Sequence, residues 1–175
     1  TVPEEYDSFK LWYSGPVRYA QKLLVSSWLN WYYVGRTHEY ITTDDSDNEG
    51  IVDGIEVHHH ADGTNRKDKL RRDIELLRQD LVDPAMADHK PRVQFYLAQT
   101  YEEMGETFAA AAFYSERSHS GSWEEERWLA QLRAAKLEKS LEALLEAYNA
   151  RPWRAEPMYY LSQLCLSLIH ISEPT

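Results

Sequence analysis

The stretch Leu97-Ala-Gln-Thr-Tyr-Glu-Glu-Met-Gly-Glu-Thr-Phe-Ala-Ala-Ala-Ala-Phe-Tyr114 decides the fold. Apolar residues recur in it at helical spacing on both sides of Gly105, and Pro91 lies where a helix would begin. Glycine commonly follows the last residue of a helix, because it adopts a left-handed backbone without steric cost. Alanines let two helices cross closely, and tyrosines fill the gap between neighbours. The stretch therefore predicts two helices joined by a tight turn.

The spacing of these residues resembles the tetratricopeptide repeat, a pair of helices in which Leu-Gly-x-x-Tyr is followed by a turn and Ala-x-x-x-Phe. The first match consists of Leu97, Ala98, Tyr101, Gly105, Ala110 and Tyr114, and a second, partial one of Ser140, Leu144, Ala147 and Pro152. A third begins at Leu161. The departures are Ala98 for Gly, Ser140 for Ala, Gln94 where Trp is usual, and a poor fit of Trp123 to Ala135. The resemblance implies a helical array over residues 84–165.

The residues before this array favour strands. Predicted strands cover Val17 to Val25, Trp31 to Val34, His38 to Thr43 and Ile51 to His59, with the acidic loop 44–50 before the last. From Thr64, an expected N-cap, Leu70, Ile74, Leu77 and Leu81 form one apolar stripe of a connecting helix that ends at Asp83-Pro84. The fold class expected is α+β, with a short β region followed by helices.

Composition limits the function classes. The chain has 175 residues, of which 43% are hydrophobic, and a formal charge of −10, which disfavours binding to nucleic acid or anionic membranes. No apolar run is long enough to cross a bilayer. The single cysteine, Cys165, excludes an intramolecular disulfide framework, so we expect a reducing compartment, the cytoplasm.

Two motifs in the β region suggest metal binding. The segment from Asp45 to Glu56 fits the twelve-residue calcium loop of oxygen ligands, but its flanks favour strands where that motif needs helices. A solvated hairpin loop is the alternative. In the run His58-His59-His60, an extended strand would turn His59 to the face of Ile55 and Val57, where it would be a hydrogen-bonded structural residue or a metal ligand. His38 and Glu39 would then lie on opposite faces of their strand.

Three motifs in order resemble the C-terminal part of a family 2 glycosyltransferase fused to tetratricopeptide repeats. They are Trp31-x-x-x-Gly-x-x-His-Glu-Tyr40, then His59-His-Ala-Asp-Gly-x-Asn-Arg66 with the helix after it, then Arg151-Pro-x-Arg-Ala-Glu-Pro157 within the helices. The resemblance extends from about Tyr6 to Leu164. It implies that residues 1–63 are the last strands of a GT-A catalytic domain and residues 64–83 a connecting helix.

The resemblance implies transfer of a sugar from a nucleotide-sugar donor to a saccharide, lipid-linked or protein acceptor, with Mn²⁺ or Mg²⁺ neutralising the leaving diphosphate. It assigns His38 and Glu39 to the catalytic site and His59 to the metal. Trp31 and Arg66 are candidate substrate-binding residues, since an indole stacks on sugars and a guanidinium binds diphosphates. The alternative function is a non-catalytic repeat scaffold that binds a peptide or protein partner.

Both ends of the chain carry expectations of their own. The chain opens at Thr1 without an initiator methionine, and the metal-binding Asp-x-Asp of the family would lie upstream, so we expect a fragment that is inactive alone. The pair Asp45 and Asp47 lies downstream of the Gly-x-x-His-Glu motif and is not that Asp-x-Asp. Leu166 to Thr175 resemble the translation of a sequencing-library adapter, and we exclude them, His170 included, from functional reasoning.

Overall fold

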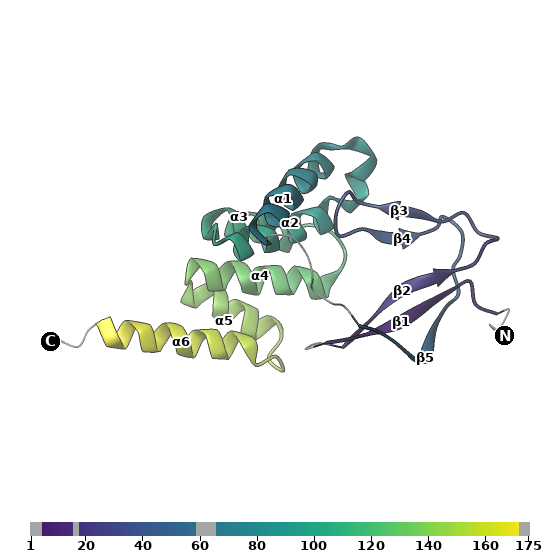
Figure 1. Cartoon of the computed structure of the whole chain (residues 1–175). Coiled ribbons are helices and arrows are strands. Elements are labelled where there is room, and N and C mark those ends of the chain that lie inside the picture. Colours follow the sequence, from purple (N-terminus) through teal and green to yellow (C-terminus); the bar gives the residue numbers. More distant parts are fainter. Residues whose placement is uncertain (1–4, 16–17, 59–65, 172–175) are drawn as a thin grey trace. The chain divides into compact units, whose positions relative to one another are not determined.

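The computed structural model describes residues 5–15, 18–58 and 66–171, and the chain divides into two compact units, Thr1–Asn65 and Arg66–Thr175. The first unit contains strands and the second contains helices (Figure 1). The predicted α+β class is confirmed. Val17, His59 and Thr64, named above as ends of predicted elements, lie outside the described residues.

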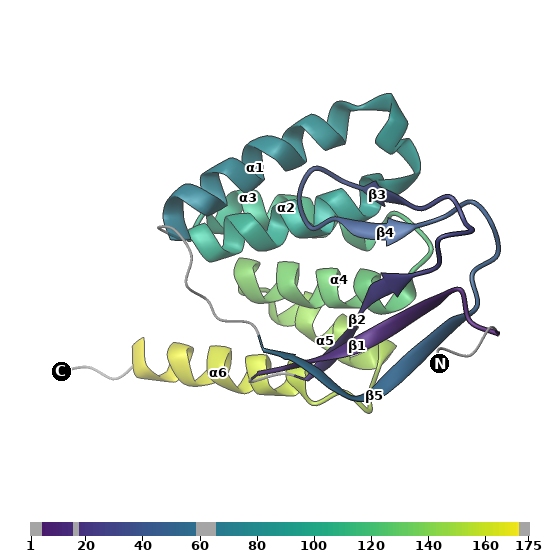
Figure 2. The ribbon, with the colours of Figure 1, turned by 45° about the vertical axis from the view of Figure 1, so that its right-hand side comes forward.

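The first unit is built around a strand that was not predicted. β1 (Ser8–Ser14) lies between β2 (Tyr19–Val25), to which it is antiparallel, and β5 (Glu49–His58), to which it is parallel (Figure 2). Phe9 and Leu11 of β1 are buried on one face of this sheet. The partner strands were predicted, and β5 begins two residues earlier than expected.

The strands β3 (Tyr32–Val34) and β4 (Tyr40–Thr42) form a separate antiparallel hairpin. The predicted strand from His38 to Thr43 is wrong at its start, because β4 begins only at Tyr40. Val34 pairs with Tyr40, so the five residues between them form the hairpin loop. The expectation that His38 and Glu39 lie on opposite faces of a strand is therefore also wrong.

The segment that fits the calcium template is mostly extended. Glu49 to Glu56 belong to β5, and the acidic side chains pair with neighbours in the sheet. Asp47 accepts a hydrogen bond from Ser8 Oγ at 2.7 Å and forms an ion pair with Lys22. Asp53 accepts a hydrogen bond from the indole N–H of Trp12 at 3.3 Å. Asp47 and Asp53 therefore each have a side-chain partner on β1 or β2.

The helical unit begins with α1 (Arg66–Val82), whose predicted apolar stripe is confirmed: Leu77 is 1% exposed, and Ile74 and Leu81 pack beside it. The predicted end at Asp83-Pro84 is confirmed as well. Asp83 accepts a hydrogen bond from Ala85 N at 3.0 Å and caps the short 3₁₀ helix η1 (Pro84–His89).

Five further helices follow, each packed mainly on the next in chain order (Figures 1 and 2). They are α2 (Lys90–Met104), α3 (Thr107–Ser118), α4 (Glu124–Glu138), α5 (Leu141–Ala150) and α6 (Glu156–Ile171). The predicted turn between α2 and α3 is confirmed, because Gly105 ends α2 with φ of 82° and its N–H donates to the Tyr101 and Glu102 carbonyls. All six residues of the first match except Gly105 are buried.

The helix pairs α2–α3 and α4–α5 are spaced by one constant interval. Lys90 and Glu124, the first residues of α2 and α4, are 34 positions apart, and so are Thr107 and Leu141, the first residues of α3 and α5. The segment around Trp123 to Ala135, which fits the repeat pattern poorly, nevertheless forms a helix at the expected interval.

Two clusters of buried side chains stabilise this unit. The first joins α1, α2, α3 and one face of α4, and the second joins the other face of α4 to α5 and α6. Leu129 packs against both clusters. Because α4 is apolar on two faces, it links the two halves of the helical unit.

Candidate functional site

The hairpin loop Gly35–Glu39 carries both residues that the resemblance assigns to catalysis. His38 and Glu39 are exposed and adjacent at its end, just before β4. The loop has left-handed backbone at two places, Gly35 with φ of 93° and His38 with φ of 51°. A side-chain-bearing residue in this region is uncommon, and such strain clusters at functional sites. Neither residue belongs to a strand, so the alternation of side chains between the two faces of a strand does not separate them.

Trp31 lies at the opposite end of the hairpin, next to Tyr32, which pairs with Thr42. A strand of three residues spans about 10 Å, so Trp31 does not share the loop with His38. Its indole N–H donates to Ser26 Oγ at 3.4 Å, and the Lys22 ammonium lies 5.0 Å from its ring centroid. Trp31 therefore contacts residues of and just after β2, and it does not belong to the loop that carries His38 and Glu39.

The other two predicted site residues lie elsewhere. His59, the proposed metal contact, falls outside the described residues. Arg66 begins α1 in the helical unit, where its Nε lies 2.5 Å from Glu103 Oε1 and its side chain is 79% exposed. Arg71 and Arg72, from the same basic segment, are exposed, as expected of a solvated face. Arg71 lies near the exposed Asp68, whereas Arg72 lies near Asp73, which is buried.

Two polar anchors around the hairpin were not predicted. Asp7 accepts hydrogen bonds from the backbone N–H of Asn48 and from the indole of Trp28, and these lower the pKa of the Asp7 carboxyl. Tyr32 donates to Asp44 at 2.6 Å, which raises the pKa of the Tyr32 hydroxyl. Contacts between residues so far apart in sequence leave no local pattern that would predict them.

The helical unit contains a polar network on α2, α3 and α4. Tyr114 donates to Glu102 Oε2 at 2.9 Å, while Arg133 donates to the Tyr114 oxygen at 2.8 Å and to Glu102 at 3.2 Å. Lys136 donates to Glu102 Oε1 at 3.1 Å. Burial, the largest effect, raises the pKa of Glu102, but the hydrogen bonds from Lys136 and Tyr114 and the Arg133 charge outweigh it, so this pKa is lowered. Burial raises the pKa of Tyr114.

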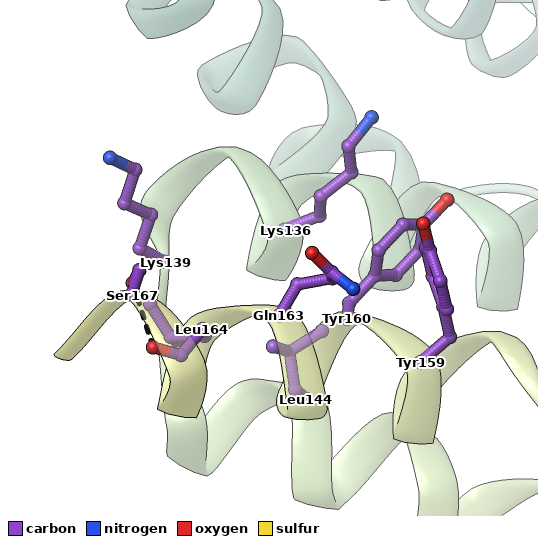
Figure 3. A pocket seen from close by; sticks show the side chains of 8 residues that line it. All are labelled: Lys136, Lys139, Leu144, Tyr159, Tyr160, Gln163, Leu164 and Ser167. Carbon is purple, nitrogen blue, oxygen red and sulfur yellow. Dashed lines mark hydrogen bonds between the residues drawn. The ribbon is translucent and has the colours of Figure 1, made fainter. Parts of the chain in front are cut away.

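A pocket of about 380 Å³ adjoins this network between α4, α5 and α6 (Figure 3). Its walls are largely apolar, with aromatic rings on one side and two ammonium groups at the rim. The lining residues are Lys136, Lys139, Leu144, Tyr159, Tyr160, Gln163, Leu164 and Ser167. Among them, Ser167 alone belongs to the adapter-like segment, and its hydroxyl donates to Leu164 O at 2.7 Å within the helix.

Metal binding has no built site in the described ranges. Within residues 5–15, 18–58 and 66–171, no three His, Cys, Asp or Glu side chains are arranged to hold an ion.

In the same described ranges, no helix has the length and apolar character that crossing a membrane requires. Comparison with protein-family models and with curated proteins finds no match to the chain.

Proposed function

We propose that the chain is the C-terminal part of a family 2, GT-A type glycosyltransferase fused to tetratricopeptide repeats. The intact enzyme would transfer a sugar from a nucleotide-sugar donor to a hydroxyl of a saccharide, lipid-linked or protein acceptor, in the cytoplasm. One observation supports the proposal most: the Gly-x-x-His-Glu motif forms a hairpin loop in which His38 is held in left-handed backbone beside an exposed Glu39.

The loop suits acceptor chemistry. A carboxylate within reach of the acceptor hydroxyl accepts its proton as the sugar is transferred, and Glu39 carries the only carboxylate of the loop Gly35–Glu39. An adjacent imidazole can hold the hydroxyl or the sugar by hydrogen bonding. Mn²⁺ or Mg²⁺, when bound in the intact enzyme, would neutralise the leaving diphosphate. The described residues do not form that metal site.

The test begins with the gene. The reading frame upstream of Thr1 should encode an Asp-x-Asp at the end of a predicted strand, and its absence would reject the proposal. In the intact enzyme, Glu39→Gln should lower kcat for nucleotide-sugar turnover about 100-fold or more, the usual contribution of a general base. Glu142→Gln, an exposed position on α5, is the matched control and should leave turnover unchanged. Full activity of Glu39→Gln would remove Glu39 from catalysis.

The second candidate function is a repeat scaffold that binds a peptide or protein partner. The interval of 34 residues between equivalent helices supports it, because this is the period of tetratricopeptide repeats. Such arrays present extended surfaces for partners. An intact chain that binds a partner but shows no donor turnover, even with its upstream sequence, would favour the scaffold over the enzyme.

A further inference from the structure

The pocket between α4, α5 and α6 combines an apolar interior with a cationic rim. Tyr160, Leu164 and Leu144 form its apolar walls, and Figure 3 shows the amines of Lys136 and Lys139 on two sides of its opening. Gln163 of α6 adds an uncharged polar group to the lining. A pocket of this size accommodates one or two side chains of a partner, and the lysines would meet negative charge next to them.

The ammonium groups of Lys136 and Lys139 differ in their interactions with neighbouring side chains. The Lys136 ammonium binds Glu102 Oε1 at 3.1 Å and lies 5.4 Å from the centroid of the Tyr160 ring, so its position is fixed and part of its charge is compensated. Within the described part of the chain, the Lys139 ammonium has no ion pair, and its side chain is exposed. An incoming carboxylate therefore finds two cations at the rim: Lys136, which is held by Glu102, and Lys139, which has no ion pair with any described residue.

The backbone of Lys139 suggests that its side chain has a role. Lys139 ends α4 in left-handed backbone, with φ of 54°. Gly105, 34 positions earlier, ends α2 in the same conformation. Glycine adopts it without the steric cost that a Cβ brings, so lysine at the second site destabilises the helix end relative to glycine. The backbone N–H of Lys139 caps α4 by donating to the Ala135 and Lys136 carbonyls. Glycine would form this cap at lower cost, so a role for the side chain explains why lysine is present.

We propose that this pocket docks an acidic segment of a partner polypeptide. An aromatic or aliphatic side chain of that segment enters between Tyr160 and Leu164, and a flanking carboxylate pairs with Lys139. The formal charge of −10 repels extended polyanions such as nucleic acid or an anionic membrane, whereas a short peptide carries its few charges directly to the rim. The inference rests on the scaffold function and does not require glycosyl transfer.

The test uses the full chain and a peptide array in which one variable apolar position is flanked by two glutamates, with a matched array flanked by glutamines. We expect selective capture of glutamate peptides and micromolar binding of the best one by fluorescence anisotropy. Lys139→Gly should weaken that binding about tenfold or more, which corresponds to about 1.4 kcal/mol. The same change should raise Tm by about 4 °C, because it relieves the strained helix end.

Two further variants separate charge from fold. Lys139→Arg should keep the binding, and Lys69→Gln, an exposed lysine on α1, should leave both binding and Tm unchanged. The proposal is overturned by unchanged binding in Lys139→Gly, by equal loss in Lys69→Gln, or by equal binding to vesicles of anionic lipid. Capture of glutamine peptides alone would reject the acidic partner and retain the scaffold. No capture on either array would reject both.

Discussion

The buried ion pair between α3 and α4 offers the sharpest test of the helical packing. Arg117 is 1% exposed and Glu126 is 5% exposed, and Arg117 Nε donates to Glu126 Oε1 at 2.7 Å. The guanidinium also donates to the carbonyl of Ser120 and, at 3.3 Å, to that of Trp123. One side chain therefore binds the carboxylate and both ends of the loop between the two helices.

The informative change is Glu126→Gln, which keeps the shape and removes the charge. It leaves the Arg117 guanidinium buried without its counter-charge, and breaking a buried pair in this way costs about 3–5 kcal/mol. For a unit the size of Arg66–Thr175, with an unfolding entropy of about 2.1 cal/mol/K per residue, a loss of 3 kcal/mol lowers Tm by about 13 °C. Replacing both partners by apolar residues, Arg117→Met with Glu126→Leu, should cost less than this single change.

Urea denaturation followed by circular dichroism at 222 nm measures these differences, and Glu124→Gln in the same first turn is the control because Glu124 is exposed. We expect the control to change the free energy of unfolding by less than about 0.5 kcal/mol. A loss below about 1 kcal/mol in Glu126→Gln, or a double variant as unstable as the sum of the single ones, would refute the reasoning.

Three further changes test other parts of the helical unit. Glu102 has a lowered pKa in the fold, so its contribution to stability is present above its unfolded value near 4.5 and is lost as pH falls through the lower folded value; Glu102→Gln should therefore weaken the dependence of Tm on pH below 4.5 in an acid titration. Gly105→Ala meets no neighbouring atom but keeps φ of 82°, and thermal denaturation should show a loss of about 1 kcal/mol from backbone strain alone. Leu97→Ala at a fully buried site should cost about 3–5 kcal/mol in urea denaturation, and a cost below 1 kcal/mol would contradict the core.

The sequence predicts the helices better than the strands. Leu70, Ile74, Leu77 and Leu81 repeat within one turn of each other, so their pattern is local and survives in α1. β1, the central strand, was not predicted, although Phe9, Leu11 and Tyr13 stand at alternate positions as expected of a strand. One partner, β5, pairs with it from about 40 positions further along the chain.

The candidate site shows a similar limit. The motif identifies His38 and Glu39, but the sequence places them in a strand, because His-Glu-Tyr-Ile-Thr-Thr favours extended structure. The left-handed φ of His38 depends on where the hairpin turns. The position of this turn follows from the pairing of Val34 with Tyr40, which the local sequence does not specify. Lys139 carries a weaker signal that could have been found, since a lysine stands 34 positions after the helix-ending Gly105.

The helix α4 supplies side chains to both buried clusters, and Leu129 packs against each. The two halves of the helical unit are therefore connected mainly through α4. The α5–α6 end can detach while α1 to α3 remain packed, since few contacts bypass α4. Amide hydrogen exchange should then fall into two classes of protection, separated at α4, with α4 itself in the slower class. Binding of a partner at the α5–α6 end would slow amide exchange in α5 and α6 and leave exchange in α1 to α3 unchanged. The effect of binding on local stability would therefore be confined to one half of the helical unit.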